Sequence, residues 1–435
     1  MKSLYSKFIL VGSLFISISL GLQFMWWKRG HILIYQTDVS ADADIKIKLD
    51  TTVNEYTPAQ ICNSSGGGCG ARSTQSKAAV NMAKENVSNT PFVWDTGSGH
   101  DRIPEQMKHI PSNILNGDTR TRVILVDSGP VNWNVKDGKQ TFIDHQCPVQ
   151  NCILVDKSTT EKRIDAILFG QDIGWLQPYE SRYRHPDAVW IFFALESPMA
   201  TGTFNFVRQL NWTATYRRDS TMVAPYERWL RFDNASSITR TRNYAKGKSK
   251  MAAIFVSNCG ASNGRLEYAK ELKRYVEVDI YGFCGDKQCA RNNARTCFGM
   301  LDKDYKFYLA FENANCRDYI TEKFFVNGLS HDAIPIVMGA HPEDYEEVAP
   351  PHSYIHVENF KSAKDLAEYM KMLDKNDELY NEYFNWKGTG SFLNTKFWCR
   401  LCSLVSDDQK PKLIVEDLEK WWRSTDTCRD GRWTD

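Results

Sequence analysis

The stretch Tyr305-Lys-Phe-Tyr-Leu-Ala-Phe311 decides the fold, because it is a mostly apolar run of strand length that ends at polar residues. A predicted helix follows at about 322–330, and Ala333-Ile-Pro-Ile-Val-Met338 is the next predicted strand. The same alternation occurs upstream, where predicted strands at 251–256 and 276–281 flank a predicted helix at 264–275. Strands that alternate with helices predict a parallel sheet with right-handed crossovers.

The first half of the chain contains a second set of short apolar runs, at 122–127, 166–169 and 189–194. A polar and basic stretch separates the two halves, and we interpret its residues 241–250 as a solvated linker. The sequence therefore predicts an α/β protein with two Rossmann-like domains that face a cleft, at 115–240 and 251–402, and a C-terminal extension at 403–435. Ligands of parallel sheets bind beyond the carboxyl ends of the strands, which is where a site is expected.

The N-terminus differs from the rest of the chain. Residues 8–27 carry no charge and end in Trp26 and Trp27, followed by Lys28 and Arg29. At about 1.5 Å per helical residue, such a run spans the apolar part of one bilayer. It predicts an uncleaved signal-anchor helix between a short cytosolic tail at 1–7 and an irregular, polar stem at 28–114.

Composition restricts the compartment and the partners. The 435 residues contain 54 Lys plus Arg against 53 Asp plus Glu, so the formal charge of +1 argues against a nucleic-acid binder. Twelve cysteines suggest an oxidising compartment with disulfides. Four N-x-S/T sequons predict glycosylation of the lumenal part, at Asn63, Asn86, Asn211 and Asn234. Together with the anchor, these features predict a single-pass type II protein of the Golgi membrane.

The segment after the deciding strand has the composition of an anion site. Thr321 is placed to cap the predicted helix, which puts Glu322 and Lys323 in its first turn. Free backbone N–H groups at a helix start attract anions, whereas the helix dipole disfavours a cation there. Lys323 therefore indicates an anionic ligand, such as a phosphate, at this position.

The same segment resembles the donor-binding signature of the α1,3-fucosyltransferases. The likeness runs through Phe311-Glu-Asn313, Asp318-Tyr-Ile-Thr-Glu-Lys-Phe-Phe325 and Ile334-Pro-Ile-Val-Met-Gly339. Upstream, Phe192-Phe-Ala-Leu-Glu-Ser-Pro198 and the stretch from Asn211 to Tyr226 are similar to motifs of the family's first domain. The resemblance covers about 122–402 and implies a GT-B-like architecture, with the acceptor-side domain first and the GDP-fucose-binding domain second.

The resemblance also implies an activity, which is inverting transfer of L-fucose from GDP-β-L-fucose to a GlcNAc hydroxyl on an N-glycan. Glu196 matches the family's catalytic base. Six residues match its donor contacts: Arg265, Tyr281, Asn313, Tyr319, Glu322 and Lys323. Of these, Arg265 and Lys323 match the contacts to the pyrophosphate. In the family, a C-terminal cysteine pair, here Cys399 and Cys402, bonds to two first-domain cysteines, which Cys147 and Cys152 match best.

No cofactor is expected to be required. Asp42-Ala-Asp44 and Asp302-Lys-Asp304 have the Asp-x-Asp form of Mn²⁺ sites, yet neither follows a strand, so we interpret both as surface carboxylates. The resemblance implies metal-independent chemistry, which Mn²⁺ could still stimulate. Eight cysteines keep an open pairing: Cys62, Cys69, Cys259, Cys284, Cys289, Cys297, Cys316 and Cys428.

Three hypotheses about function remain open. The run Ser257-Asn-Cys-Gly-Ala-Ser-Asn263 and the Cys399-Arg-Leu-Cys402 pair look most like the core-type enzymes, which fucosylate the Asn-linked GlcNAc. A Lewis-type enzyme, acting on antennary Gal-GlcNAc, is the first alternative. A catalytically silent glycan-binding relative is the second. Ala314 departs from the family's usual serine.

Overall fold

The computed structural model describes residues 90–433, apart from 98, 174–175, 177–178, 180–181, 184–185, 234–241 and 290–293. The predicted tail, the predicted membrane helix and most of the predicted stem lie outside these residues. So do the sequons at Asn63, Asn86 and Asn234 and the cysteines Cys62 and Cys69. Among the described residues, no helix has the length and apolar character needed to span a bilayer.

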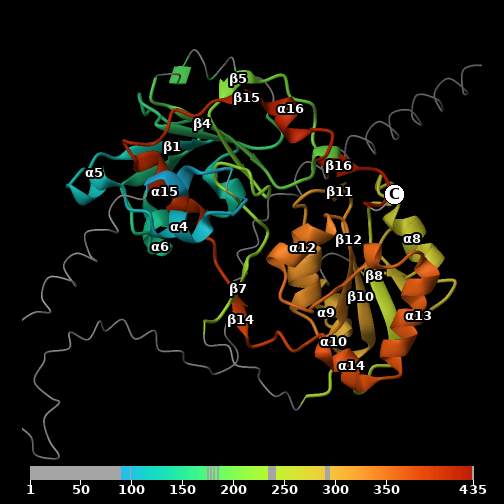
Figure 1. Cartoon of the computed structure of the whole chain (residues 1–435). Coiled ribbons are helices and arrows are strands. Elements are labelled where there is room, and N and C mark those ends of the chain that lie inside the picture. The colour runs from blue at the N-terminus through green and yellow to red at the C-terminus, as the bar shows by residue number, and fades with distance from the viewer. Residues whose placement is uncertain are drawn as a thin grey trace, which may run out of the picture. The chain divides into compact units, whose positions relative to one another are not determined.

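Two parallel sheets form the framework, each with five strands within the described part of the chain (Figure 1). The first lobe has the strand order β2-β1-β3-β4-β6 and the second has β13-β12-β10-β8-β9. The first sheet consists of β1 (Arg122–Val126), β2 (Cys152–Val155), β3 (Ala166–Phe169), β4 (Val189–Ala194) and β6 (Trp212–Thr215). The second consists of β8 (Lys250–Phe255), β9 (Val278–Tyr281), β10 (Tyr305–Phe311), β12 (Ile334–Met338) and β13 (Ile355–His356). Both lobes thus have the expected α/β class.

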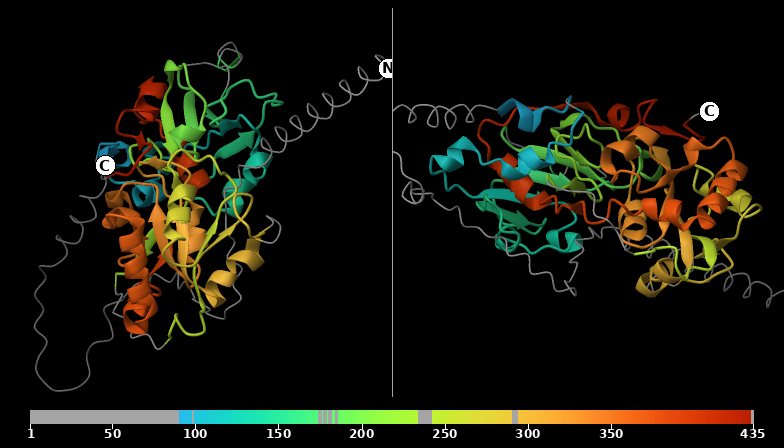
Figure 2. Two further views of the ribbon diagram at one scale, coloured as in Figure 1. Left: turned by 90° about the vertical axis from the view of Figure 1, so that its right-hand side faces the viewer. Right: turned by 60° about the horizontal axis from the view of Figure 1, so that its bottom comes forward.

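Helices cover the second sheet on both faces, as the two views of Figure 2 show. Phe307 and Leu309 of β10 pack with the apolar sides of α8 (Arg265–Leu272) and α13 (Ala363–Asp374). Tyr308 and Ala310 point the other way, toward a cluster that includes residues of α10 (Met300–Lys303) and α12 (Pro342–Val348). Because side chains alternate along a strand, a strand buried on both faces must be apolar throughout, which explains the continuous run.

The remaining elements connect these layers. Further helices are α3 (Thr90–Trp94), α4 (Ile103–Lys108), α5 (Ser112–Leu115), α6 (Gln140–Asp144), α9 (Ala294–Phe298), α11 (Glu322–Phe324), α14 (Asp377–Glu382), α15 (Phe397–Ser406) and α16 (Leu418–Trp422). Short helical turns occur at Pro130–Trp133, Pro198–Ala200, Phe325–Leu329 and Val357–Asn359. Three antiparallel ladders pair β5 (Val207–Leu210) with β15 (Val415–Asp417), β7 (Trp229–Arg231) with β14 (Gly390–Phe392), and β11 (Asn315–Cys316) with β16 (Cys428–Arg429).

The predicted stem ends earlier than residue 114, which corrects the boundary. Arg102 and Gln106 are fully buried. The Nε2 of Gln106 donates to the carbonyl of Thr221 at 3.0 Å, and its Oε1 accepts from Arg400 Nη1 at 3.0 Å. Their polar character suggested exposure, but both satisfy buried polar partners far along the chain, as buried polar groups must. Residues 92–114 therefore belong to the folded unit.

The C-terminal segment returns to the first lobe, so the predicted boundary at 402 falls within α15. Cys399 and Cys402 of this helix form disulfides with Cys147 and Cys152, respectively, and this confirms the implied set of four. Trp398 packs on Trp133 with ring centroids 5.6 Å apart. The bridges thus fix α15 to the first lobe, and beyond it β15 pairs with the first lobe and β16 with the second.

Six of the eight cysteines with open pairing are also bonded. The disulfides join Cys259 to Cys284, Cys289 to Cys297, and Cys316 to Cys428. The first of them links the loop after β8 to the loop after β9. Bonds of this number are typical of an oxidising compartment.

Two polar residues, Lys248 and Asn211, form hydrogen bonds that hold distant segments together. Lys248, in the stretch that we interpreted as a solvated linker, is 9% exposed and donates to the carbonyls of Leu301 and Tyr305, both at 2.8 Å. Asn211 accepts from the Trp190 N–H at 2.9 Å and donates to the Leu413 carbonyl at 3.1 Å. The linker is therefore held to the second lobe by the buried Lys248. Asn211 joins β4 to the segment at Leu413, and the glycosylation of Asn211 stays a prediction.

Candidate active site

Glu196 and Tyr319 bring the two lobes together at the carboxyl ends of their strands. Glu196 is half-buried and follows β4, and its backbone N–H donates to Gln171 Oε1 at 3.1 Å. The Tyr319 hydroxyl, from the loop after β11, donates to Glu196 Oε2 at 3.1 Å. The candidate base is thus in direct contact with the predicted donor-binding motif of the other lobe.

Aromatic residues enclose this contact. Tyr319 is 1% exposed, and its ring centroid lies 5.1 Å from that of Tyr216. Tyr226 donates its hydroxyl to the Leu195 carbonyl at 2.9 Å, next to Glu196. Burial, and then the charges of Glu322, Glu196 and Glu312, raise the pKa of Tyr226 well above its usual range. Tyr226 therefore stays a neutral hydroxyl among three carboxylates from both lobes.

A buried carboxylate, Glu312, organises the segment that carries Lys323. Glu312 follows β10 and is fully buried. Its two oxygens accept from the backbone N–H and the hydroxyl of Thr321, each at 2.8 Å. Its Oε2 also lies 3.2 Å from Lys323 Nζ. Gly339 permits the close approach of Glu312, since a Cβ there would lie 2.6 Å from Glu312 Cγ.

Thr321 caps the next helix as predicted, but the helix is short. The Thr321 hydroxyl accepts from the Lys323 backbone N–H at 3.3 Å. The α-helical part covers only Glu322–Phe324 and continues as a π-helical turn, Phe325–Leu329. The dipole of so short a helix is small. The positive charge at this position therefore comes from the Lys323 side chain and not from the helix, contrary to our expectation.

The charges around Lys323 keep it protonated. Burial would lower the pKa of Lys323, but the nearby carboxylates of Glu312 and Glu322 hold it above its usual range. Burial would raise the pKa of Glu322, yet Lys323 outweighs this effect and lowers it. Complete burial raises the pKa of Glu312 in spite of the lysine beside it. The result is an ammonium group beyond the carboxyl end of β10, the central strand of the second sheet, where an anionic ligand could bind.

Arg265 lies at the start of α8, as predicted, and is only 5% exposed. It donates to the carbonyl of Phe311 at 3.0 Å and to that of Asn258 at 3.2 Å. Burial lowers the pKa of this guanidinium, against the opposing charge of Glu312. Arg265 thereby ties the loop after β8 to the end of β10, and its positive charge stays in the same region as Lys323.

Several buried polar atoms near these residues have no hydrogen-bond partner within the part of the chain that the structure describes. They include Arg265 Nε, Asn313 Oδ1, Ser197 Oγ and the Tyr216 hydroxyl. Buried polar groups are normally paired, so orphaned atoms gathered in the predicted motifs fit a site for a polar ligand.

One predicted donor contact lies apart from the others. Tyr281 is at the carboxyl end of β9, but it is 7% exposed and stacks on Phe255 with ring centroids 5.0 Å apart. Its hydroxyl is 2.8 Å from that of Tyr305. Both contacts are part of the packing of the core. Tyr281 therefore lies in the core of the second lobe and not with Glu196, Arg265 and Lys323.

One of the carboxylates considered for metal binding, Asp302, has another role in the structure. Asp302 accepts from the Asp332 backbone N–H at 2.9 Å and lies 3.0 Å from His331 Nδ1. Across the described ranges, no cluster of three or more His, Cys, Asp or Glu side chains is arranged to hold a metal ion. Asp42 and Asp44 lie outside the described residues. Metal independence stays a prediction.

Sequence reasoning assigned no role to Glu312 or Tyr226, although both fall within motifs that it recognised. A carboxylate directly after a buried strand and nine residues before a capping threonine is the signal that could have identified Glu312. For Tyr226 no local signal exists, because its role depends on carboxylates of both lobes.

Comparison with known proteins follows the division into lobes. Residues 119–227 match the N-terminal fucosyltransferase domain, and residues 245–421 match the C-terminal domain of glycosyltransferase family 10, the fucosyltransferases. The chain is 48% identical over 339 residues to a Drosophila melanogaster protein named glycoprotein 3-alpha-L-fucosyltransferase A, which covers 77% of this chain and 67% of the relative. It is 35% identical over 299 residues to a rat 4-galactosyl-N-acetylglucosaminide 3-alpha-L-fucosyltransferase 9, covering 65% and 79%, respectively.

A solved α1,3-fucosyltransferase with GDP aligns with a TM-score of 0.45 and 17% identity, over 72% of this chain and 97% of that one. The family assignment rests on the sequence matches, which include both domains in order. The chain belongs to glycosyltransferase family 10, and it is an α1,3-fucosyltransferase.

Proposed function

We propose that this enzyme transfers L-fucose from GDP-β-L-fucose, with inversion, to O3 of the Asn-linked GlcNAc in the N-glycan core, and that Glu196 is the general base. The observation that carries the proposal is the Tyr319–Glu196 contact of 3.1 Å, which places a carboxylate of the first lobe against the donor motif of the second. A single displacement needs such a base on the acceptor side and positive charge on the donor side.

Each candidate residue then has a defined task. The Glu196 carboxylate accepts the proton of the acceptor hydroxyl as that oxygen attacks the anomeric carbon of fucose. The Tyr319 hydroxyl orients the carboxylate. Lys323 and Arg265 neutralise the negative charge that develops on the departing GDP, which removes the need for a metal ion at the pyrophosphate. Because attack and departure occur on opposite sides of one carbon, the β-linked donor yields an α-linked product.

The choice of acceptor rests on the relatives. The relative at 48% identity is named for a glycoprotein acceptor, and the rat relative at 35% identity is named for a galactosylated GlcNAc acceptor. The first relative has the higher identity and matches a larger share of this chain, which supports a glycoprotein acceptor. This agrees with the core-type features of the sequence.

Product mapping tests this acceptor. Full-length enzyme is incubated with GDP-fucose and two glycopeptides, one with a free core and ungalactosylated antennae, the other with galactosylated antennae and a core already fucosylated at O3. We expect mass spectrometry to find new fucose only on the Asn-linked GlcNAc of the first. Fucose only on the galactosylated antennae would instead establish the Lewis-type alternative. Donor binding without any transfer to either glycopeptide would refute the proposed function.

We also propose that the enzyme is held in the Golgi membrane by residues 8–27, with the catalytic part in the lumen. The five disulfides in the described part of the chain support an oxidising compartment. In sealed Golgi vesicles, added protease should leave the C-terminal part intact until detergent is added. Digestion of that part without detergent would contradict this orientation.

A further inference from the structure

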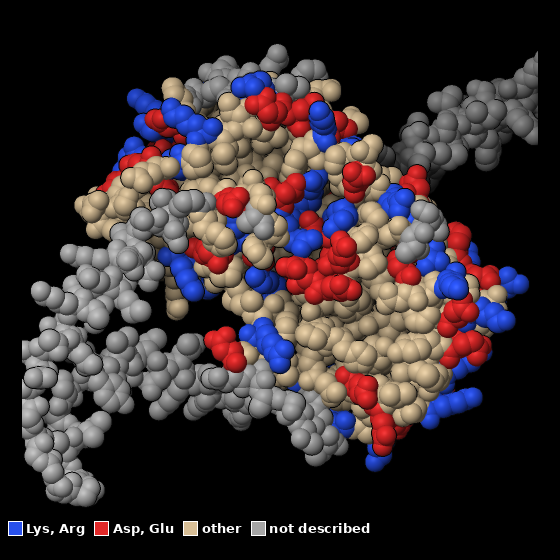
Figure 3. Space-filling model, in the orientation of Figure 1, with Lys and Arg blue, Asp and Glu red and all other residues tan. Residues whose placement is uncertain are grey.

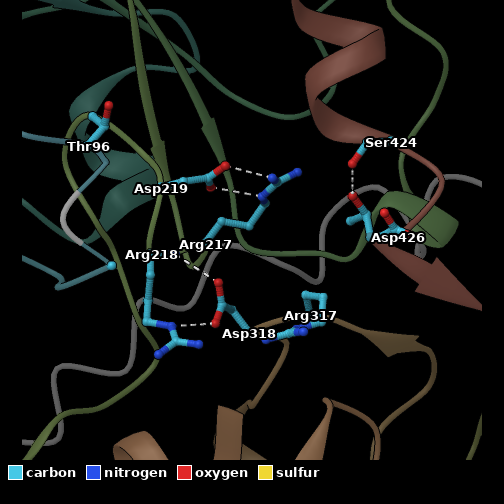
Figure 4. A pocket seen from close by; sticks show the side chains of 10 residues that line it. Thr96, Arg217, Arg218, Asp219, Arg317, Asp318, Ser424 and Asp426 are labelled. Carbon is cyan, nitrogen blue, oxygen red and sulfur yellow. Dashed lines mark hydrogen bonds and ion pairs between the residues drawn. The ribbon is translucent and has the colours of Figure 1, made fainter. Parts of the chain in front are cut away.

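A group of ion pairs joins the two lobes away from the proposed reacting atoms. Arg218, in the loop after β6, donates from Nε to Asp318 Oδ1 at 2.7 Å and from its backbone N–H to Asp318 Oδ2 at 3.0 Å. Its Nη2 donates to Asp344 Oδ1 at 2.9 Å. Figure 4 shows the side chains of Arg218 and Asp318 directed at one another across the junction. One arginine of the first lobe therefore binds two carboxylates of the second.

The second lobe holds its side of this junction in an unusual conformation. Asp318 has a φ of 60°, in the left-handed region that non-glycine residues seldom adopt. Its backbone N–H donates to Asp344 Oδ2 at 2.9 Å, and Asp344 is 1% exposed. Arg317 also donates to Asp344, from Nε to Oδ2 at 3.0 Å. Asp344 thus fixes the turn at Asp318, and Arg218 fixes this turn against the first lobe.

The turn leads directly to the proposed site. Tyr319, the next residue, donates to Glu196, and Thr321 two residues later binds Glu312 and caps the turn that carries Lys323. The segment from Asp318 to Lys323 thus contains Tyr319, which contacts the proposed base, and Lys323, whose positive charge faces the proposed donor site. Its position relative to the first lobe decides how far Glu196 lies from the fucose.

Stability alone gives a weak explanation of this cluster. In Figure 3, charged side chains of both signs gather in the middle of the visible face, where the two lobes meet. Arg218 and Asp318 line an open cavity of about 370 Å³, and their side chains are 23% and 16% exposed. The Arg218–Asp318 pair is partly hydrated, and such pairs contribute little net stability, because desolvation offsets much of the attraction. The planar guanidinium of Arg218 holds two carboxylates, Asp318 and Asp344, in a fixed relative geometry, which a flexible point charge could not do.

We propose that Arg218 is a positioning residue for the transfer reaction, which docks the Asp318–Lys323 segment onto the first lobe so that Glu196 meets the bound donor. This inference rests on the proposed role of Glu196. It predicts that loss of Arg218 impairs turnover and leaves donor binding, which depends on residues of the second lobe, nearly unchanged.

The test compares Arg218→Met with Arg217→Met in the full-length enzyme. Arg217 is the matched control, because its guanidinium pairs with Asp219 at 2.7 Å in its own lobe and contacts the C-terminal segment packed there. A displacement of about 1 Å in a reacting group costs up to about 10²-fold in rate. We therefore expect Arg218→Met to lower kcat by at least 10-fold with the Kd for GDP within about 3-fold of wild type.

The control and a conservative variant separate positioning from folding. Arg217→Met should keep kcat within about 3-fold of wild type even if it lowers the thermal midpoint as much as Arg218→Met does. Arg218→Lys should restore part of the rate, since it keeps the charge and loses the planar group that binds Asp318 and Asp344 together. The inference is wrong if Arg218→Met turns over normally, if both methionine variants lose kcat equally, or if GDP affinity falls as much as kcat.

Hydrogen exchange supplies a readout that does not need turnover. In Arg218→Met, amides of the peptide 316–324 should exchange faster than in wild type, and in Arg217→Met they should not. Unchanged exchange in Arg218→Met would overturn the inference even if the wild-type enzyme transferred no fucose. Absence of transfer by the wild-type enzyme would refute the proposed function instead, so the two failures are distinguishable.

Discussion

Replacement of Glu196 by Gln is expected to reduce kcat by about 10²- to 10⁴-fold, the range that a general base contributes. The amide has nearly the same shape and can still accept from the Tyr319 hydroxyl, which lies 3.1 Å from Glu196 Oε2. It cannot take the proton of the acceptor hydroxyl. The expected loss is therefore chemical, and it should appear at saturating concentrations of both substrates.

The binding of GDP separates this prediction from general damage. Because Arg265 and Lys323 belong to the second lobe, Glu196→Gln should keep the Kd for GDP within a few-fold of wild type and leave the thermal midpoint unchanged. Glu161→Gln, an exposed position in the same lobe, is the control that should behave as wild type in all three measurements. Full activity of Glu196→Gln would remove this residue from the mechanism.

Replacement of Lys323 by Met is expected to weaken GDP binding by about 10- to 100-fold. A hydrogen bond to a charged group is worth about 1.5–3 kcal/mol, and every 1.4 kcal/mol is about tenfold in affinity. The loss should appear in titration calorimetry with GDP, without an acceptor present.

A single substitution at this position also leaves Glu312 unpaired in the interior, since its Oε2 lies 3.2 Å from Lys323 Nζ and its side chain is fully buried. An unpaired buried charge costs several kcal/mol, so Lys323→Met should also lower stability. The double variant Glu312→Gln with Lys323→Met removes both charges and should recover most of the stability while its affinity for GDP stays low. Wild-type affinity in the double variant would refute the phosphate role of Lys323.

Local pattern was sufficient to predict seven of the ten strands in the two sheets, while β2, β6 and β13 were not predicted. The apolar run at 305–311 is strand β10, and Thr321 caps the turn that follows, because both depend on residues close in sequence. The resemblance to the family identified the cysteines that hold α15 to the first lobe. Hydrophobic periodicity and helix capping depend only on residues close in sequence, so they can be predicted without the fold.

Burial of charged residues could not be predicted in this way. Arg218 binds Asp318, which is 100 positions away, and Arg400 binds Gln106, which is 294 positions away. In the sequence, each of these residues looks the same as a charged or polar residue on the surface. Its burial becomes favourable only because a distant segment supplies a hydrogen-bonding partner. For the same reason the polar residues 92–114 resembled a stem, and Lys248 resembled part of a linker.

The most direct test of the account measures GDP affinity and turnover for Glu196→Gln and for the double variant at 312 and 323 in one experiment. If one site combines a base from the first lobe with a cation from the second, Glu196→Gln should bind GDP normally and lose about 10²- to 10⁴-fold in kcat. The double variant should bind GDP weakly and regain part of its transfer rate as GDP-fucose is raised. Equal loss of affinity and turnover in both variants would contradict this division of roles.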